Sequence, residues 1–223
     1  MEKRRTLLRE DHPDTLTSMA NLAATYWNQG RWSEAKQLEL QVMEKRKTLL
    51  GEDHPDTLTS MANLAATYRK QGRWSKAEQL ELQVMEKTKT LLGEDHPDTL
   101  SSMANLAATY QKQGRLSEAE QLDLQVMEKR KTLLGEDHPE TLSSMANLAA
   151  TYRKQGWWSE AEQLDLQVME KRKTLLGEDH PDTLSSMANL AATYRKQGKW
   201  SEAEQLEMER QKPFLKRHYK QHG

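Results

Sequence analysis

Five histidines are the residues of this chain whose type and spacing first point to metal chemistry. Each follows an aspartate, and they recur at intervals of 42 residues: His12, His54, His96, His138 and His180. All ligands of one zinc ion lie within about 2 Å of it, whereas packed helices are about 8–10 Å apart. If the units stack as helix pairs, equivalent histidines are too far apart to share an ion. Because a proline follows each histidine, we expect a turn that starts a helix and no metal site.

The chain also lacks the usual arrangements of catalytic residues. It contains no cysteine, which excludes thiolate metal ligands and disulfides. There is no glycine-rich phosphate loop and no Ser-His-Asp arrangement in the sequence. Charged residues recur in step with the repeat, as they do on solvated helix faces. The sequence therefore predicts a protein that is not an enzyme and needs no cofactor.

A repeated stripe of amide, small and cationic side chains is the strongest candidate for a binding surface. Within residues 55–96 it consists of Thr59, Asn63, Ala66 and Lys70, at spacings of four, three and four residues. On a helical wheel its centre lies roughly 170° from the apolar residues of the same segment. An asparagine side chain both donates and accepts hydrogen bonds, so it can pair with the backbone of an extended peptide. Alanine leaves room for that backbone to approach.

The stripe and the arginines beside it give the predicted peptide-binding residues. Its asparagines are Asn21, Asn63, Asn105, Asn147 and Asn189, and its cations are Arg69, Lys70, Lys112, Arg153, Lys154, Arg195 and Lys196. These cations would favour an acidic peptide. Two plainer interpretations stay open: the asparagines bond to a neighbouring helix or to water, and each arginine is an ordinary solvated charge.

Two helices per 42-residue unit must position this stripe. The stretch Met-Ala-Asn-Leu-Ala-Ala-Thr-Tyr occurs five times unchanged, so the chain is a tandem array. In the unit that starts at Pro55, proline suits the first position of a helix, and Gly72 is a typical helix stop. Between them the apolar residues follow the helical period: Leu58, Met61, Leu64, Ala65 and Tyr68.

A second helix follows in each unit. Ser75 and Glu78 match a capping box, which predicts the start of this helix, and the box recurs at Ser117/Glu120, Ser159/Glu162 and Ser201/Glu204. The second helix carries the apolar residues Ala77, Leu80, Val84, Leu91 and Leu92 and is predicted to end at Gly93. The tryptophans just before this helix, Trp32, Trp74, Trp158 and Trp200, are predicted to lie in the core, and the extra Trp157 to be exposed. Short connections make neighbouring helices antiparallel.

The array is predicted to cover residues 1–212 as one quasi-linear domain. Residues 1–8 would form a partial helix, and full units would start near Pro13, Pro55, Pro97, Pro139 and Pro181. Pro213 is predicted to stop the last helix and leave a disordered basic tail at residues 213–223.

The unit resembles the tetratricopeptide repeat, or TPR. The residues that carry the resemblance are Leu64, Ala65, Tyr68, Gly72, Trp74 and Ala77. The 42-residue period and the Leu-Gly-x-Asp-His-Pro link are similar to those of kinesin light chain repeats. The residues Met-Ala-Asn-Leu-Ala and Gln-Gly-Arg-Trp also resemble the TPR arrays of fungal and bacterial NLR-like proteins. The late aromatic residue of the family's second helix is replaced by Glu39, Glu81, Asp123, Asp165 and Glu207. The resemblance implies an all-α, right-handed superhelical solenoid whose first helices line a concave groove that binds peptides or proteins.

Composition agrees with such a binding module. The apolar fraction of 35% and the charged fraction of 30% suit a thin array with a narrow core, and the net charge of −1 argues against nucleic-acid binding. No apolar run approaches the ~20 residues of a membrane span, so we expect a cytoplasmic protein. Two alternatives stay open: a structural repeat that associates weakly head to tail, and the sensor arm of a larger NLR-like ATPase.

Overall fold

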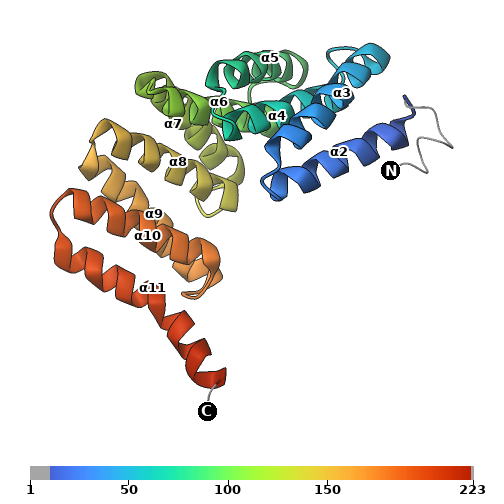
Figure 1. Cartoon of the computed structure of the whole chain (residues 1–223). Coiled ribbons are helices and arrows are strands. Elements are labelled where there is room, and N and C mark those ends of the chain that lie inside the picture. The colour runs from blue at the N-terminus through green and yellow to red at the C-terminus, as the bar shows by residue number, and fades with distance from the viewer. Residues whose placement is uncertain (1–10, 222–223) are drawn as a thin grey trace. The chain divides into compact units, whose positions relative to one another are not determined.

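A computed structural model describes the backbone of residues 11–221 and the side chains of residues 11–211. The chain divides into two compact units, one up to Gly114 and one from Arg115. The predicted partial helix at residues 1–8 lies outside the described residues. Within the described part every regular element is an α-helix (Figure 1).

The first unit consists of α2 (Pro13–Asn28), α3 (Trp32–Leu50), α4 (Pro55–Lys70), α5 (Trp74–Leu92) and α6 (Pro97–Gln113). The second consists of α7 (Leu116–Leu134), α8 (Pro139–Gln155), α9 (Trp158–Leu176), α10 (Pro181–Lys196) and α11 (Trp200–Gln221). Within each unit every helix packs against the next one along the chain. The even-numbered helices from α2 to α10 are the predicted first helices, and α3, α5, α7, α9 and α11 are the predicted second helices.

The His-Pro turn starts each first helix, as predicted. In α4, Pro55 is the first helical residue and Asp56 lies in the first turn. His54 precedes them with extended backbone, and its Nδ1 accepts a hydrogen bond from the Asp56 N–H at 3.1 Å. The histidine therefore caps a helix N-terminus, where unpaired N–H groups need an acceptor.

Glycine ends the first helices, as predicted. Gly72 has a φ of 71°, in the left-handed region that favours glycine. This conformation turns the chain back so that the Arg73 N–H donates to the Tyr68 carbonyl oxygen at 2.9 Å. Such a bond closes a Schellman-type turn and satisfies a carbonyl at the helix end.

The capping box predicted for the second helices is wrong. In α5, α7 and α9 the helix begins one residue before the serine, and the residue at the cap position makes no side-chain cap hydrogen bond. The turn at Gly72 is short enough that Trp74 is already the first residue of α5. Ser75 therefore lies inside the first turn of the helix. Ion pairs support this end in two repeats: Arg31 Nε lies 2.9 Å from Glu34 Oε1, and Arg115 Nε lies 2.9 Å from Glu118 Oε1.

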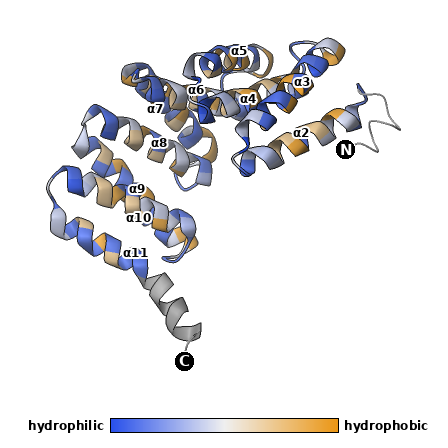
Figure 2. Ribbon diagram, viewed as in Figure 1, coloured by the Kyte–Doolittle hydropathy of each residue, from blue (hydrophilic) through white to orange (hydrophobic). Residues whose placement is uncertain are grey.

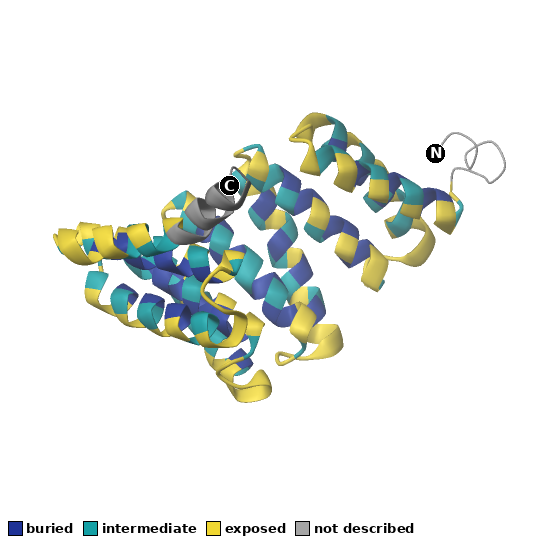
Figure 3. Cartoon of the chain, turned by 90° about the horizontal axis from the view of Figure 1, so that it is seen from below, coloured by how far each residue is buried: buried dark blue, intermediate teal, exposed yellow. Residues whose placement is uncertain are grey.

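Apolar residues of adjacent helices form a narrow core in each unit. Leu16 and Met19 of α2 meet Val42 of α3 in one cluster, and Leu58 and Met61 meet Val84 in the next. A buried side chain of this kind contributes about 1.5–3 kcal/mol. In Figures 2 and 3 the apolar and buried residues lie on the sides of helices that face one another, and the turns are exposed.

The core leaves out the leucines at the end of α5 and, contrary to the prediction, two of the four repeated tryptophans. Leu91 and Leu92 are 50% and 43% exposed, because the last turn of α5 extends past the buried Val84 and Thr88. Of the repeated tryptophans, Trp32 and Trp200 are 37% and 67% exposed, and Trp74 and Trp158 are half-buried. The alanine three residues after each tryptophan is buried in its stead, as Ala35 and Ala203 show. Trp157 is exposed, as predicted.

The helix end predicted at Pro213 is also wrong, because α11 continues to Gln221. Proline keeps a φ that suits a helix and removes one backbone hydrogen bond, so it weakens or kinks a helix without always ending it. The side chains of the predicted basic tail lie outside the described residues.

Candidate functional site

The predicted stripe lies on the outer face of the first helices. Asn21, Asn63 and Asn147 are exposed, whereas Asn105 and Asn189 are partly buried. The four lysines at the ends of these helices are all exposed: Lys70, Lys112, Lys154 and Lys196. In the first unit α2, α4 and α6 carry this face, and in the second α8 and α10 carry it.

The predicted arginines contact buried carboxylates instead of facing solvent alone. Arg69 Nε lies 3.2 Å from Glu81 Oε1, and Glu81 is only 3% exposed. The other guanidinium nitrogens of Arg69 donate to the backbone oxygen and to Oδ1 of Asn105, at 3.3 and 3.2 Å. One arginine thus joins the buried acid of its own repeat to the stripe asparagine of the next.

In the second unit aspartates take the place of the buried glutamate, and their partners include an arginine and threonines. Arg153 Nη1 donates to Asp165 Oδ2 at 2.5 Å, and the same oxygen accepts a bond from the Thr193 hydroxyl at 2.7 Å. The Thr151 hydroxyl donates to Asp123 Oδ2 at 2.6 Å. Arg195 is exposed and lies 3.4 Å from Glu207. These ion pairs reduce the positive charge that the arginines offer to a ligand, and the exposed cations of the predicted set are the four lysines and Arg195.

Sequence reasoning missed that these acids are buried. The acidic residue at the late aromatic position of the second helix gives no sign of burial by itself. A repeating threonine in the next first helix and an arginine in the same repeat were the available signal, because a buried charge needs such partners. Burial raises the pKa of Glu81 to about 7, although Thr109 and Arg69 both act to lower it.

The first repeat lacks the arginine and has a hollow in the same place. Trp27 occupies the position of Arg69, and Glu39 occupies that of Glu81. A hollow of about 260 Å³ opens between α2 and α4, and its lining includes Trp27, Glu39, Val42 and Asn63. Glu39 is 7% exposed, and its Oε2 has no hydrogen-bond partner. Burial raises the pKa of this carboxyl, and the Thr67 hydroxyl opposes the shift.

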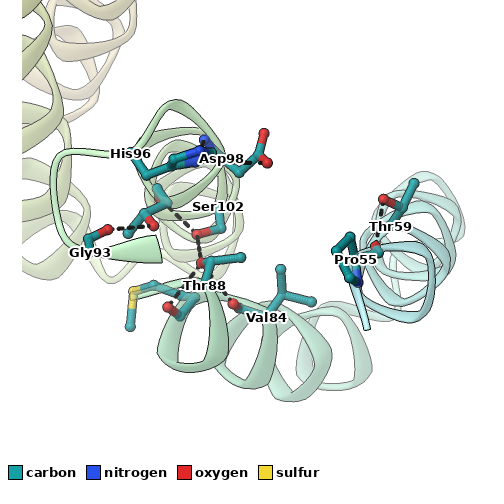
Figure 4. A network of polar contacts seen from close by, with 10 residues as sticks. Pro55, Thr59, Val84, Thr88, Gly93, His96, Asp98 and Ser102 are labelled. Atoms are coloured by element: carbon teal, nitrogen blue, oxygen red, sulfur yellow. Dashed lines mark hydrogen bonds and ion pairs between the residues drawn. The ribbon is translucent and has the colours of Figure 1, made fainter. Parts of the chain in front are cut away.

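A second hollow, of about 390 Å³, opens between α4 and α6. Figure 4 shows Pro55 and Thr59 on one side of this hollow and Thr88 and Ser102 on the other. The hydroxyl oxygens of Thr88 and Ser102 are 3.3 Å apart. In the first, third and fourth repeats an arginine replaces Thr88, and each donates to the serine equivalent to Ser102 at 3.0 Å: Arg46 to Ser60, Arg130 to Ser144 and Arg172 to Ser186. The equivalent hollow of the first repeat, of about 350 Å³, is lined by Arg46 beside Leu49 and Leu50, so the shorter threonine leaves the leucines in place and removes only the guanidinium.

Neither hollow has the features of a metal centre. Among the described residues, no three His, Asp or Glu side chains gather closely enough to hold a metal ion. The helices in that part of the chain also include none with the length and apolar character needed to cross a membrane.

The family model of the tetratricopeptide repeat matches residues 15–56, 57–98, 99–140, 141–182 and 183–209. Because these matches cover most of the sequence, the chain belongs to the TPR family. No curated protein matches it.

Solved structures with the same fold include the nearly identical TPR-like repeats of a Podosopora anserina protein named after kinesin light chain. That structure is 33% identical with a TM-score of 0.78 and covers 92% of this chain and 97% of its own. A single-substitution variant of it is 32% identical with a TM-score of 0.81, over 93% of this chain and 98% of its own. The protein NprR, solved with its cognate peptide NprX, has a TM-score of 0.68 at 16% identity, over 96% of this chain and 63% of its own. The chain is thus an all-α TPR repeat array of the kinesin-light-chain-like type.

Proposed function

We propose that the first-helix face of the first unit binds an extended segment of a partner protein. The observation that carries the proposal is the pair of hollows between α2 and α4 and between α4 and α6, because clefts between helices are typical ligand sites. NprR has the same fold, and its structure was solved with its cognate peptide bound. A binding role also fits the TPR family, and it needs no catalytic residue.

The exposed asparagines supply the backbone contacts in this proposal. Asn21 and Asn63 face solvent on α2 and α4, and the alanines beside them, Ala24 and Ala66, line the first hollow. A peptide backbone lying across these helices would exchange hydrogen bonds with both amides. Lys70 and Lys112 at the helix ends would favour acidic residues in the partner.

The test begins with a peptide selected for binding to the full chain. Replacing Asn21 and Asn63 with alanine should weaken that peptide at least tenfold at any salt concentration, because backbone pairing is lost. Replacing Lys70 and Lys112 with alanine should weaken it mainly at low salt, since exposed charges are screened. Gln37→Ala removes an exposed amide from α3 and serves as the control. Unchanged affinity in both double variants would show that the partner binds elsewhere.

The alternatives predicted from the sequence remain hypotheses. Head-to-tail association depends in part on residues 1–8, which lie outside the described residues, and sedimentation velocity over a hundredfold concentration range tests it. A strict monomer at every concentration would exclude that association. A role as the sensor arm of an ATPase requires a phosphate-binding loop upstream in the same polypeptide. A cytoplasmic location likewise stays a prediction.

A further inference from the structure

The first repeat differs from the second at the position that neutralises the buried acid. Arg69 in the second repeat contacts Glu81 and the side chain of Asn105. The corresponding residues of the first repeat are Trp27, Glu39 and Asn63, so the acid and the amide are kept and the guanidinium is replaced. Both Glu39 and Asn63 line the hollow between α2 and α4.

The hollow contains unsatisfied polar atoms of both kinds. Glu39 Oε2 is a buried acceptor without a partner, and Trp27 Nε1 is a buried donor without a partner. A carboxylate that is 93% buried without a counter-charge is costly, so a cation that reaches it gains a strong, charge-assisted interaction. The remaining walls come from apolar atoms of Val42, Ala24 and Ala66, which suit the methylene stem of a long side chain.

We propose that this hollow binds an arginine side chain of the partner peptide. Its guanidinium would contact Glu39 and Asn63 as Arg69 contacts Glu81 and Asn105, and its plane would stack on the Trp27 indole. Guanidinium is favoured over ammonium, because its planar fork serves a carboxylate and an amide oxygen together. The inference rests on the proposed function and adds the chemistry of one ligand residue to it.

The lysine beside the Trp27 ring does not block this site. Lys70 Nζ lies 5.1 Å from the centre of the Trp27 ring, in the range of a cation–π contact. Lys70 is exposed, so its charge is hydrated and screened by salt. An arginine that binds the buried carboxylate displaces the lysine from the ring towards solvent, where the lysine charge stays hydrated.

The experiment titrates the full chain with three capped pentapeptides, Gly-Ser-X-Ser-Gly, in which X is arginine, citrulline or lysine. Citrulline has nearly the shape of arginine and no charge. Two NMR signals report on the hollow: the Trp27 indole N–H, assigned with Trp27→Phe, and the Asn63 side-chain amide. The arginine peptide should shift both signals to saturation. The citrulline peptide should leave them in place at the same concentration, and the lysine peptide should bind several-fold more weakly than arginine.

Three variants make the assignment specific. Glu39→Gln should weaken the arginine peptide at least tenfold, whereas Glu81→Gln makes the same change in the second repeat and should leave the dissociation constant within twofold. Trp27→Arg copies the second repeat and supplies the guanidinium from within the chain, so the Asn63 signal should no longer respond to the peptide. Because Trp27→Arg restores a pairing that the fold already contains, it keeps the test decisive even if Glu39→Gln unfolds.

Equal shifts with arginine and citrulline, or undiminished binding to Trp27→Arg, would overturn the inference. Its failure is separable from that of the proposed function. If a selected peptide still requires Asn21 and Asn63 while the arginine pentapeptide shifts neither signal, only the arginine site is wrong. If the pentapeptide requires Glu39 while the selected peptide requires neither asparagine, only the proposed groove is wrong.

Discussion

At the scale of single residues, the buried acids of the second helices are the least expected feature. An acidic residue on a helix wheel predicts a solvated face, and nothing within α3 or α5 indicates that Glu39 or Glu81 is covered. Burial follows from the next first helix, which brings a threonine over the carboxylate. Periodicity within one helix cannot predict this contact, because it depends on how consecutive repeats stack.

The buried Glu81 predicts a pH-dependent stability. Its pKa is about 7 in the folded chain, against an ordinary value of 4.5. Between these values the folded chain holds a proton that the unfolded chain releases, so the free energy of unfolding falls as pH rises. The loss should reach about 3–4 kcal/mol at most, since one pKa unit corresponds to about 1.4 kcal/mol. Glu81→Gln lacks this loss.

Urea denaturation at pH 5 and pH 8 measures the effect. Relative to the unsubstituted chain, Glu81→Gln should gain stability on going from pH 5 to pH 8. Glu86→Gln, at an exposed position of the same helix, is the matched control and should show no such trend. The same relative stability of Glu81→Gln at both pH values would contradict the raised pKa.

At the scale of elements, the starts and stops of the first helices follow from local sequence. Proline, histidine and glycine act through backbone geometry and nearby hydrogen bonds, which a single repeat contains in full. The start of the second helix could not be predicted in the same way. A Ser-x-x-Glu pattern is a capping box only if the serine precedes the helix, and Ser75 lies two residues after the cap position, which Arg73 holds.

This difference predicts opposite outcomes for two small substitutions. His54→Ala removes the side chain that accepts the Asp56 N–H, and it should cost about 1 kcal/mol. Ser75→Ala should change stability by less than about 0.5 kcal/mol, as exposed substitutions away from caps usually do. Chemical denaturation of both variants checks the assignment. A larger loss for Ser75→Ala than for His54→Ala would restore the capping box and reject the histidine cap.

At the scale of the whole molecule, the repeat pattern predicted the fold class, and differences between repeats determine the candidate site. The hollow that contains Glu39 lies where Trp27 replaces the arginine found in the second, fourth and fifth repeats. Copied positions therefore reveal the scaffold, whereas the few substituted positions indicate where a ligand could bind. Sequence reasoning weighted the copied asparagines and did not single out Trp27.

Near-identity of the repeats also predicts how the array tolerates deletion. Removing residues 55–96 joins His54 to Pro97, which recreates the natural His-Pro link, and Thr109 then replaces Thr67 beside Glu39. In a linear array the shorter chain should keep its helical signal per residue and melt at a lower temperature. Circular dichroism measures both quantities. Complete loss of helix would show that stability is not shared among similar units.

Protection of single cysteines tests the proposed binding face most directly. The chain has no cysteine, so Ala24→Cys on α2 and Gln37→Cys on α3 each introduce one exposed, uniquely reactive thiol. Alkylation is followed by mass spectrometry with and without the selected peptide at saturation. We predict that the peptide slows alkylation at Ala24→Cys at least tenfold and leaves Gln37→Cys unaffected. Protection of Gln37→Cys with free alkylation of Ala24→Cys would contradict binding at the first helices.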